Sequence, residues 1–594
     1  MSDPSNNALP HQHLASKFLA SLYAAGVTDF VVCPGSRNTP LTLTLLQMDT
    51  SSNFPSLKIW RHIDERAAGY FALGIARSSG NPVAVMVTSG SAVANLYPAV
   101  MEARMSRVPL IILTADRPPE LQDTGSNQTA KQTDLFGIHS KWSMQLPVAD
   151  SDAISRIADF ASSVAARAVL NSLESPAGPA HINIPFREPL LAEQASTGAL
   201  DLQLPPSLPT STSTAAATAR MDISFLSNLV KAKQGILICG PDNALPITQI
   251  AELASHLGWP IIADPLSNMR NGPHDITNVI STADTILRSH TCSDRLYPQQ
   301  TIRFGGIPTS KILNQWLSDS GAQSIVIDDA SAGYAGLRSE YDREVVIRIT
   351  AEKFCEEVSD LVSVNYERDA EYLTKWLGAE TLLRSFTTNF IAEEEAFFEG
   401  SIFHTLTSNM SSVGTVVLGN SMPVRDADSF LRTSDATFRV AGTRGVSGID
   451  GVLSAAAGAA TGNSTLLVLG DLSFIHDANG LWPAKHYDLN LKILLINNLG
   501  GGIFSFLPQR NLLEENWFEE WWGAPHNMDV KSLTTAYGIP HKLLSTGEHI
   551  GVVLEEMSEP GPAVYEIRTD RSNNLAQHKK YWAAATALLE SELK

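Results

Sequence analysis

Cysteine is scarce in this sequence, and no hydrophobic run is long. The chain of 594 residues has four cysteines and no Cys-x-x-Cys pair; they are Cys33, Cys239, Cys292 and Cys355. This scarcity argues against a disulfide framework and against a zinc site, and it fits a reducing cytosol. No apolar stretch reaches the roughly 18 residues that a membrane-spanning helix needs.

Basic residues are also in short supply. The chain has 43 Lys and Arg against 62 Asp and Glu, a net charge of −19. A nucleic-acid partner is not expected, because that class of protein needs a basic surface. The polar start of the chain lacks the basic and then hydrophobic order of a secretory signal, so we expect a cytoplasmic protein whose charge serves solubility. Acidic small substrates remain open, because a local group of Arg and Lys can oppose the global charge.

Strand and helix patterns alternate along the chain. This alternation predicts an α/β fold of mostly parallel sheets flanked by helices. We expect three units, at residues 1–192, 221–370 and 371–594, with a linker rich in Ala, Ser, Thr and Pro at 193–220. The expected strands span residues 29–33, 58–62, 82–87, 109–114, 235–240, 259–264, 324–329, 415–418, 437–440, 465–469 and 492–496, and the expected helices include 65–77, 92–105 and 449–461.

Side chains with a carboxylate or an amide oxygen follow two of the expected strands in the last unit. Asp471 ends one apolar run, and Asn498 follows another, with three glycines from Gly500 onward. Ligands bind at the carboxyl ends of parallel strands, and Mg²⁺ prefers carboxylate and amide oxygens beside phosphates and water. Either motif alone is more often a simple turn or a helix cap. Both together, each after an apolar strand, favour a metal–diphosphate site whose glycines admit close backbone approach.

Glu65 lies between a strand and an apolar helix, within His62-Ile63-Asp64-Glu65-Arg66. An acid at this place usually just complements the helix dipole. Thiamine diphosphate (ThDP) chemistry, however, needs one buried carboxylate against the aminopyrimidine ring, while the cofactor supplies the reactive carbon. Glu65 is our candidate, and an apolar pocket around it would raise its pKa.

Ten segments together resemble the ThDP-dependent enzymes of the 2-oxo-acid decarboxylase type. More narrowly, they are similar to the 2-succinyl-5-enolpyruvyl-6-hydroxy-3-cyclohexene-1-carboxylate (SEPHCHC) synthase family. The first and last thirds of the chain resemble it well and the middle third weakly, and PGSRNTPLT, TADRPPEL and RGVSGIDG are the most specific runs. The segments are CPGSRNTPLTL (33–43), HIDERAAGYFALGIA (62–76), VTSGSAVANLYPAV (87–100), LTADRPPEL (113–121), GSNQTAKQ (125–132), RFGGIPTSK (303–311), GNSMPVRD (419–426), RGVSGIDG (444–451), GDLSF (470–474) and NNLGGGIF (497–504).

The resemblance implies a transferase with a three-domain ThDP-enzyme architecture. A pyrimidine-binding domain would span 1–192, a central domain 221–370 and a diphosphate-binding domain 371–594. The implied reaction decarboxylates 2-oxoglutarate and adds the resulting succinyl-semialdehyde carbanion to isochorismate in a 1,4-addition, within menaquinone or phylloquinone biosynthesis. The family's active sites lie between two chains, which implies a homodimer or a tetramer.

The resemblance also assigns residues. Glu65 falls on the catalytic glutamate, Ile449 on the bulky residue that holds ThDP bent, and Asp471, Asn498 and the Gly500 carbonyl on the Mg²⁺ ligands, with Mn²⁺ as a substitute. Further cofactor contacts are expected at Thr88, Ser89, Ser421, Met422, Gly448, Leu472, Ser473 and Gly501. Substrate contacts are expected at Ser36, Arg37, Asn127, Gln128, Lys311, Ser421, Arg425, Arg444 and Phe504, with Arg117 as an addition.

The basic residues in that set make chemical sense on their own. Both implied substrates are dianions, and Arg binds a carboxylate with two parallel hydrogen bonds. Two alternatives stay open. Another ThDP carboligase, similar to acetolactate synthase, would share Glu65, Asp471 and Asn498 but has less need for the arginines. A non-catalytic protein on the same scaffold should have lost the glutamate or a metal ligand, and all are present.

Overall fold

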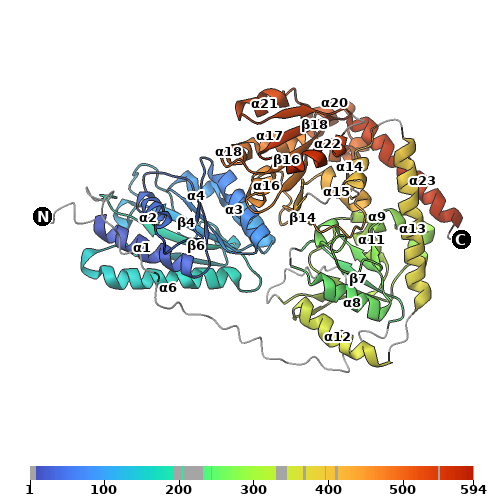
Figure 1. Cartoon of the computed structure of the whole chain (residues 1–594), viewed down its shortest axis with the longest axis horizontal. Helices are drawn as coiled ribbons and strands as arrows, with labels where there is room; N and C mark the ends of the chain where they lie inside the picture. Colours follow the sequence, from blue (N-terminus) through green and yellow to red (C-terminus); the bar gives the residue numbers. More distant parts are fainter. Residues whose placement is uncertain are drawn as a thin grey trace. The chain divides into compact units, whose positions relative to one another are not determined.

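The computed structural model describes residues 8–191, 204, 232–242, 244–329, 344–365, 369–394, 397–407, 413–545 and 549–592. The linker predicted at 193–220 lies outside these residues, apart from Leu204. The chain forms two compact units (Figure 1). Unit 1 contains the described residues of 1–216 together with 443–462 and 477–487, and unit 2 contains the rest.

The described residues form three six-stranded sheets, and every strand pair in them is parallel. The strand orders are β2-β1-β3-β4-β6-β5 in unit 1, and β12-β11-β10-β7-β8-β9 and β14-β13-β15-β16-β18-β17 in unit 2. The prediction of mostly parallel sheets is thus confirmed. The strands are β1 (Asp29–Val32), β2 (Lys58–Arg61), β3 (Val83–Val87), β4 (Leu110–Asp116), β5 (Trp142–Gln145), β6 (Ala180–Pro185), β7 (Gly235–Cys239), β8 (Ile261–Ala263), β9 (Val279–Ile280), β10 (Gln300–Phe304), β11 (Gln323–Ile327), β12 (Glu344–Ile347), β13 (Thr415–Leu418), β14 (Arg439–Gly442), β15 (Thr465–Gly470), β16 (Leu491–Asn497), β17 (His541–Leu543) and β18 (Ala563–Arg568).

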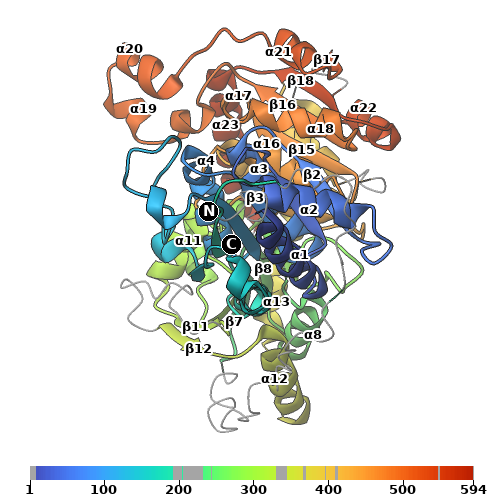
Figure 2. The same ribbon diagram turned by 90° about the vertical axis from the view of Figure 1, so that its left-hand side faces the viewer.

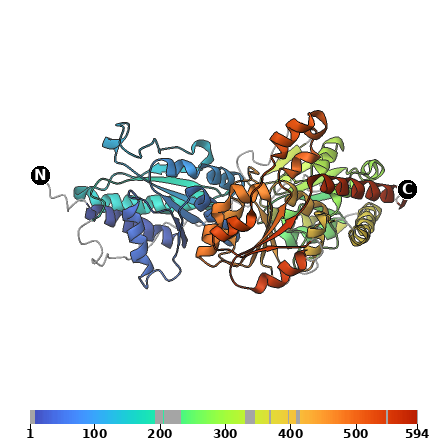
Figure 3. The same ribbon diagram turned by 90° about the horizontal axis from the view of Figure 1, so that it is seen from above.

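Helices cover each sheet because the central strands are apolar on both faces. Every residue of β3, β4 and β16 is buried, as expected for parallel strands between helical layers. In unit 1, α1 (Ala8–Ala24) packs against α6 (Ile154–Leu173) along the sheet, and Figure 3 shows them from above. In unit 2, α13 (Ala370–Glu393) packs against the C-terminal helix α23 (Arg571–Glu592).

One helix of unit 1 comes from the C-terminal half of the sequence. Helix α16 (Val452–Ala459) packs against α3 (Glu65–Ser79), and Figure 2 shows the two together. Glycine permits this close packing. A methyl carbon built on Gly74 would lie 2.0 Å from the carbonyl oxygen of Ala455, and one on Gly458 would lie 2.1 Å from that of Phe71.

Two predicted helices need correction. The helix expected at 92–105 is divided into α4 (Ser91–Asn95) and α5 (Tyr97–Met105), because Pro98 lacks an N–H and fits only in a first turn. The helix expected at 449–461 is the shorter α16, because Gly451 takes a left-handed φ of 69° just before it. No helix among the described residues is long and apolar enough to cross a membrane.

Candidate active site

The carboxyl end of the third sheet gathers the predicted metal ligands. Asp471 follows β15 and begins helix α17 (Asp471–His476), while Asn498 and Gly500 follow the neighbouring strand β16. The N–H of Gly500 donates to Asp471 Oδ2 at 2.9 Å, and the N–H of Leu472 donates to Oδ1 at 2.7 Å. The fold therefore brings Asp471 into direct contact with the glycine loop.

One buried oxygen at this edge has no hydrogen-bond donor among the described residues. The amide oxygen of Asn498 is buried and accepts no hydrogen bond from the described residues. Leaving such a group unpaired costs about 1–3 kcal/mol, so it is usually met by water or an ion. Within the described ranges no three His, Cys, Asp or Glu side chains form a metal cluster. The donor set here is instead a carboxylate, an amide oxygen and a backbone oxygen, which fits Mg²⁺ carrying diphosphate and water.

The loop after β16 requires glycine at position 500. Gly500 has a φ of 154°, and a methyl carbon on it would lie 2.1 Å from the carbonyl oxygen of Gly523. Gly501 donates its N–H to the same carbonyl at 2.8 Å. Leu499 takes a left-handed φ of 57°, a conformation that costs about 1–3 kcal/mol and often marks functional sites. Contacts with Gly523 therefore fix the shape of this loop.

His526, which was not predicted from the sequence, faces the same carboxylate. Its Nε2 lies 3.2 Å from Asp471 Oδ2. Burial raises the pKa of Asp471, and the N–H groups of Gly500 and Leu472 oppose that shift. No spacing rule in the sequence links His526 to Asp471, so only the fold could identify it.

Residues Ser421, Met422 and Arg425 lie at the same sheet edge as Asp471. They begin helix α15 (Met422–Phe430) directly after β13, which is the neighbour of β15. Ser421 takes a left-handed φ of 74°. Arg425 Nη1 donates to the Ser421 carbonyl at 2.6 Å, so the guanidinium is folded back toward the start of the helix.

A second cluster lies at the carboxyl end of the first sheet, in unit 1. Thr88 and Ser89 follow β3, and Arg117 follows β4. Arg117 Nη1 donates to Ser89 Oγ at 2.5 Å and to the Gln128 carbonyl at 2.6 Å. Gln128 Nε2 donates to the Ser89 carbonyl at 3.0 Å. The fold thus joins Ser89, Arg117 and Gln128, which were predicted as cofactor or substrate contacts.

Arg37 is buried at this edge and already has protein partners. Its Nη1 donates to the Phe186 carbonyl at 2.9 Å, and its Nη2 pairs with Glu188 Oε1 at 2.9 Å. Burial, followed by the nearby charge of Arg37, lowers the pKa of Arg117. Arg37 is thus already paired, whereas Arg117 at the same sheet edge has the fork geometry that suits a carboxylate ligand.

Glu65 is the first residue of α3. Its side chain is half-buried, and Asn95 Nδ2 donates to its Oε2 at 3.4 Å. The expectation from the sequence is a carboxylate in an apolar pocket, whereas the single chain leaves this one partly exposed. His62, three residues earlier, is buried, and burial lowers its pKa to about 4.

The predicted residues Arg444, Gly448 and Ile449 share one loop of unit 1. Ile449 is 39% exposed, and Val446 in the same loop is 41% exposed. Asp450, the next residue, accepts a hydrogen bond of 2.5 Å from the hydroxyl of Tyr70 on α3. The loop is therefore tied to α3.

The remaining predicted residues are more scattered. Ser36 and Asn127 are exposed loop residues of unit 1, while Ser473 is buried in α17. Phe504 is half-buried beside Gly501. Lys311 is exposed at the start of α11 (Lys311–Asp319) beside the middle sheet, and none of the contacts described for it joins it to the other predicted residues.

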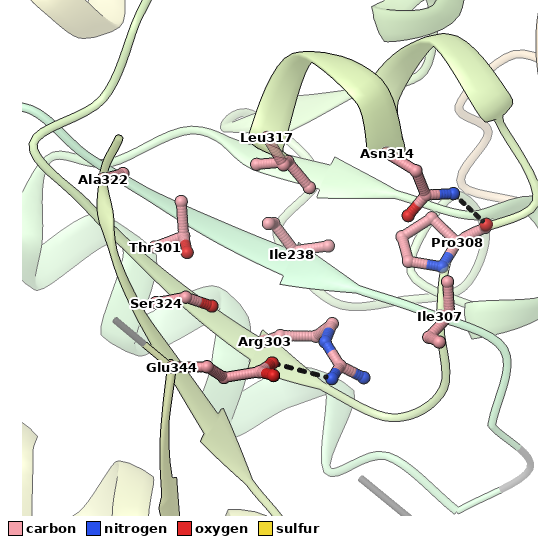
Figure 4. Close-up of a pocket in the computed structure, with 10 residues that line it drawn as sticks. All are labelled: Ile238, Thr301, Arg303, Ile307, Pro308, Asn314, Leu317, Ala322, Ser324 and Glu344. Atoms are coloured by element: carbon pink, nitrogen blue, oxygen red, sulfur yellow. Dashed lines mark hydrogen bonds and ion pairs between the residues drawn. The ribbon is translucent and has the colours of Figure 1, made fainter. Parts of the chain in front are cut away.

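A pocket lies on the sheet that contains β7, β10 and β11, under α11 (Figure 4). Arg303 pairs there with Glu344 at 3.3 Å, and Asn314 Nδ2 donates to the Pro308 carbonyl at 2.8 Å. None of the predicted site residues lines it. We assign no part of the candidate site to this pocket.

Comparison with known proteins adds independent findings. Residues 12–136 match the family described as thiamine pyrophosphate enzyme, N-terminal TPP binding domain. Residues 212–417 match the middle domain of thiamine pyrophosphate enzymes, and residues 428–567 match the thiamine pyrophosphate enzyme, C-terminal TPP binding domain.

Curated relatives match over nearly the whole chain, and three of them share the name 2-succinyl-5-enolpyruvyl-6-hydroxy-3-cyclohexene-1-carboxylate synthase. The relative from Chloroflexus aurantiacus is 39% identical over 577 residues, which cover 96% of this chain and 95% of that protein. The relative from Geobacillus thermodenitrificans is 38% identical over 95% of this chain and 94% of its own length. The relative from Bacillus cytotoxicus is 36% identical over 97% of each.

Proposed function

Because the chain belongs to the SEPHCHC synthase family of ThDP-dependent transferases, we propose that it decarboxylates 2-oxoglutarate and adds the remaining succinyl-semialdehyde unit to isochorismate. The products are CO₂ and SEPHCHC, in menaquinone or phylloquinone biosynthesis. The likeness along almost the full chain carries this proposal. The cytoplasm and a homodimer or tetramer with sites between chains belong to the same proposal, as do domains at 1–192, 221–370 and 371–594 with a linker at 193–220.

We propose that Asp471, Asn498 and the Gly500 carbonyl hold Mg²⁺, or Mn²⁺ in its place, and through it the diphosphate of ThDP. The buried amide oxygen of Asn498, which accepts no hydrogen bond from the described residues, supports this assignment. Leu472, Ser473, Gly501, Ser421 and Met422 would line the cofactor from the same sheet edge. When bound, ThDP supplies the reactive carbon and the electron sink that decarboxylation and carbon–carbon bond formation require.

Glu65 is the proposed catalytic acid. Its role is to hold and move a proton at the ring nitrogen of the aminopyrimidine. The place of Glu65 at the start of α3, beside the sheet edge that carries Thr88 and Ser89, supports this role. Ile449 and Gly448 would lie against the cofactor, and the exposure of the Ile449 side chain fits a contact completed by ligand or by a second chain.

The arginines are the proposed readers of substrate charge. Both substrates carry two carboxylates, and Arg37, Arg117, Arg425 and Arg444, with Lys311, would neutralise them. The hydrogen bonds that hold Arg117 beside Ser89 and Gln128 support an anion site at that edge. Ser36, Asn127, Gln128 and Phe504 would complete the pocket by hydrogen bonding and packing.

The test is a two-substrate assay. Purified protein with ThDP, Mg²⁺, 2-oxoglutarate and isochorismate should release CO₂ and form the adduct in equal amounts, as measured by coupled CO₂ detection and mass spectrometry. Omitting isochorismate should abolish the adduct. Turnover of pyruvate with no turnover of this substrate pair would refute the proposal and favour a carboligase of the acetolactate-synthase kind.

A further inference from the structure

A buried carboxylate outside the predicted site holds the loop that carries Arg444. Glu102 lies on α5 and is 1% exposed. Its Oε1 accepts the N–H of Gly445 at 3.0 Å, and its Oε2 accepts the N–H of Val446 at 2.8 Å. Both oxygens thus bind the two backbone amides that directly follow Arg444.

Glu102 has two further partners, so its buried carboxylate is both paired with a cation and hydrogen-bonded. Arg77 Nη2 lies 3.2 Å from Oε1, and Ser106 Oγ donates to Oε1 at 2.6 Å. A buried carboxylate is tolerated only when it is paired and hydrogen-bonded in this way. A shift of the loop would therefore leave this buried carboxylate with fewer hydrogen-bond partners, which costs free energy.

Close packing reinforces these hydrogen bonds at both ends of the loop. A methyl carbon on Gly445 would lie 2.7 Å from Ser106 Oγ and 2.8 Å from the carbonyl oxygen of Glu102. At the other end, one on Gly451 would lie 1.9 Å from Cγ of the Tyr70 ring. Residues 444–451 are thus held against α5 at their start and against α3 at their end.

We propose that Glu102 is a positioning residue that sets the direction of Arg444 toward a substrate carboxylate. The inference rests on the proposed function, because the role of Arg444 as a carboxylate ligand is part of that proposal. Glu102 fixes the peptide groups on the carboxyl side of Arg444, and the side chain projects from that fixed backbone. Specificity for an acidic substrate then depends on a residue that does not touch it.

The substitution Glu102→Gln tests this directly. A glutamine can present its oxygen to only one of the two amides, and its NH₂ group would face the other N–H, donor against donor. The loop must shift, and a displacement of about 1 Å in a positioned group can lower kcat/KM roughly 100-fold. We expect KM for one of the two acidic substrates to rise roughly 10- to 100-fold while kcat changes less than about threefold, since the lost interaction binds the ground state and the transition state equally.

A double-mutant cycle with Arg444→Ala separates positioning from general damage. If Glu102 acts through Arg444, Glu102→Gln should add less than about a twofold change in KM once Arg444 is absent. The inference is overturned if both KM values stay near those of the parent protein. It is equally overturned if the KM effect persists undiminished in the Arg444→Ala background.

A second variant covers the case in which Glu102→Gln does not fold. Gly445→Ala moves the same loop by steric contact without uncovering a buried charge, and it should give the same rise in KM and the same dependence on Arg444. Gly462→Ala is the matched control, because a methyl carbon there meets nothing within 4 Å, and its KM values should equal those of the parent.

Failure of the inference is distinguishable from failure of the proposed function. If Arg444→Ala alone leaves both KM values unchanged, the substrate role of Arg444 is wrong and the inference falls with it. If Arg444→Ala raises KM while Glu102→Gln and Gly445→Ala do not, the substrate role stands and only the positioning inference is refuted.

Discussion

Two sheet edges differ in how complete they are within a single chain. One is the edge of unit 2 that carries Asp471, Asn498 and Gly500, here called the diphosphate edge. The other is the edge of unit 1 that carries Glu65, here called the acid edge. Asp471 accepts a hydrogen bond from the Gly500 N–H, and the amide oxygen of Asn498 in the same loop is buried without a hydrogen-bond donor among the described residues. Glu65, by contrast, is half-buried, and the hydrogen bond to it from Asn95 is long, at 3.4 Å.

This difference shows which of the proposed site residues are already held in place by contacts within one chain. Adjacent parallel strands bring Asp471 and the Gly500 loop together, and close contact with Gly523 fixes that loop. If this edge holds the proposed metal ion, little reorganisation of the loop is needed on binding. Glu65 is only half-buried, and among the described residues the one hydrogen bond to its carboxylate comes from Asn95. The two edges should therefore fail differently when they are mutated.

The largest effect is expected at the acid edge. Glu65→Gln should lower kcat about 10²- to 10⁴-fold, because it removes proton transfer while keeping the shape. ThDP should still raise the melting temperature of this variant, since the diphosphate edge is intact. A Glu65→Gln rate close to that of the parent would remove Glu65 from proton chemistry.

The next effect is expected at the diphosphate edge. Asp471→Asn removes the one carboxylate among the proposed ligands, and even outer-shell changes cost 10- to 100-fold in metal affinity. We expect Mg²⁺ affinity in the presence of ThDP to fall about 100-fold or more, measured by calorimetric titration. Glu65→Gln should leave this affinity unchanged. Equal Mg²⁺ affinity in the Asp471→Asn variant and the parent would contradict the ligand assignment.

A smaller, pH-dependent effect is expected from Asp477, a fully buried acid of unit 1. Both of its oxygens accept hydrogen bonds from Ser454, and burial raises its pKa from 3.8 to about 7. Between these pH values the folded chain keeps a proton that the unfolded chain has released. The free energy of unfolding should therefore fall as pH rises through this window, by at most about 1.4 kcal/mol per pH unit.

Comparison with Asp477→Asn isolates that contribution. The variant carries no titrating group at position 477. The unfolding free energy of the parent minus that of the variant should therefore fall from pH 4 to pH 7 and then level off. His62, whose pKa burial lowers to about 4, destabilises both proteins as pH falls below 6.5 and cancels in the difference. Urea unfolding at several pH values measures it, and a difference independent of pH would contradict the account.

The smallest effect is expected from a surface pair that belongs to neither edge. Arg187 and Glu120 pair in unit 1 with about half of each side chain exposed, at 45% and 48%. Exposed pairs contribute about 0–1 kcal/mol. Glu120→Gln should leave kcat unchanged and lower the free energy of unfolding by less than about 1 kcal/mol, so it sets the baseline for the other variants.

Much of the fold could be predicted because apolar periodicity and turn residues can be recognised within short stretches of sequence. The strands around Asp29, Val83 and Leu491 follow from short apolar runs, and the parallel sheets follow from their alternation with helices. The three matched domains confirm the predicted ThDP-enzyme architecture. Strands such as β10 and β18 were not identified, because polar residues interrupt their apolar pattern, as Arg303 and Glu566 do.

The site was predictable only where its residues cluster in motifs. Asp471 and Asn498 follow recognisable strands, and their assignment as ligands stays a prediction that the geometry supports. His526 and Glu102 could not be identified in this way, because each acts through a contact that joins segments far apart in the sequence: Glu102 meets Gly445 across 343 positions. Such contacts arise from packing and leave no local pattern.

The most direct test of the central claim is a crystal structure of the protein with ThDP and Mg²⁺. We predict one metal ion bound by an Asp471 carboxylate oxygen, the Asn498 amide oxygen and the Gly500 carbonyl, with a Glu65 carboxylate hydrogen-bonded to the aminopyrimidine ring. A complex in which the Asn498 oxygen stays away from the metal, or in which Glu65 faces water, would contradict it.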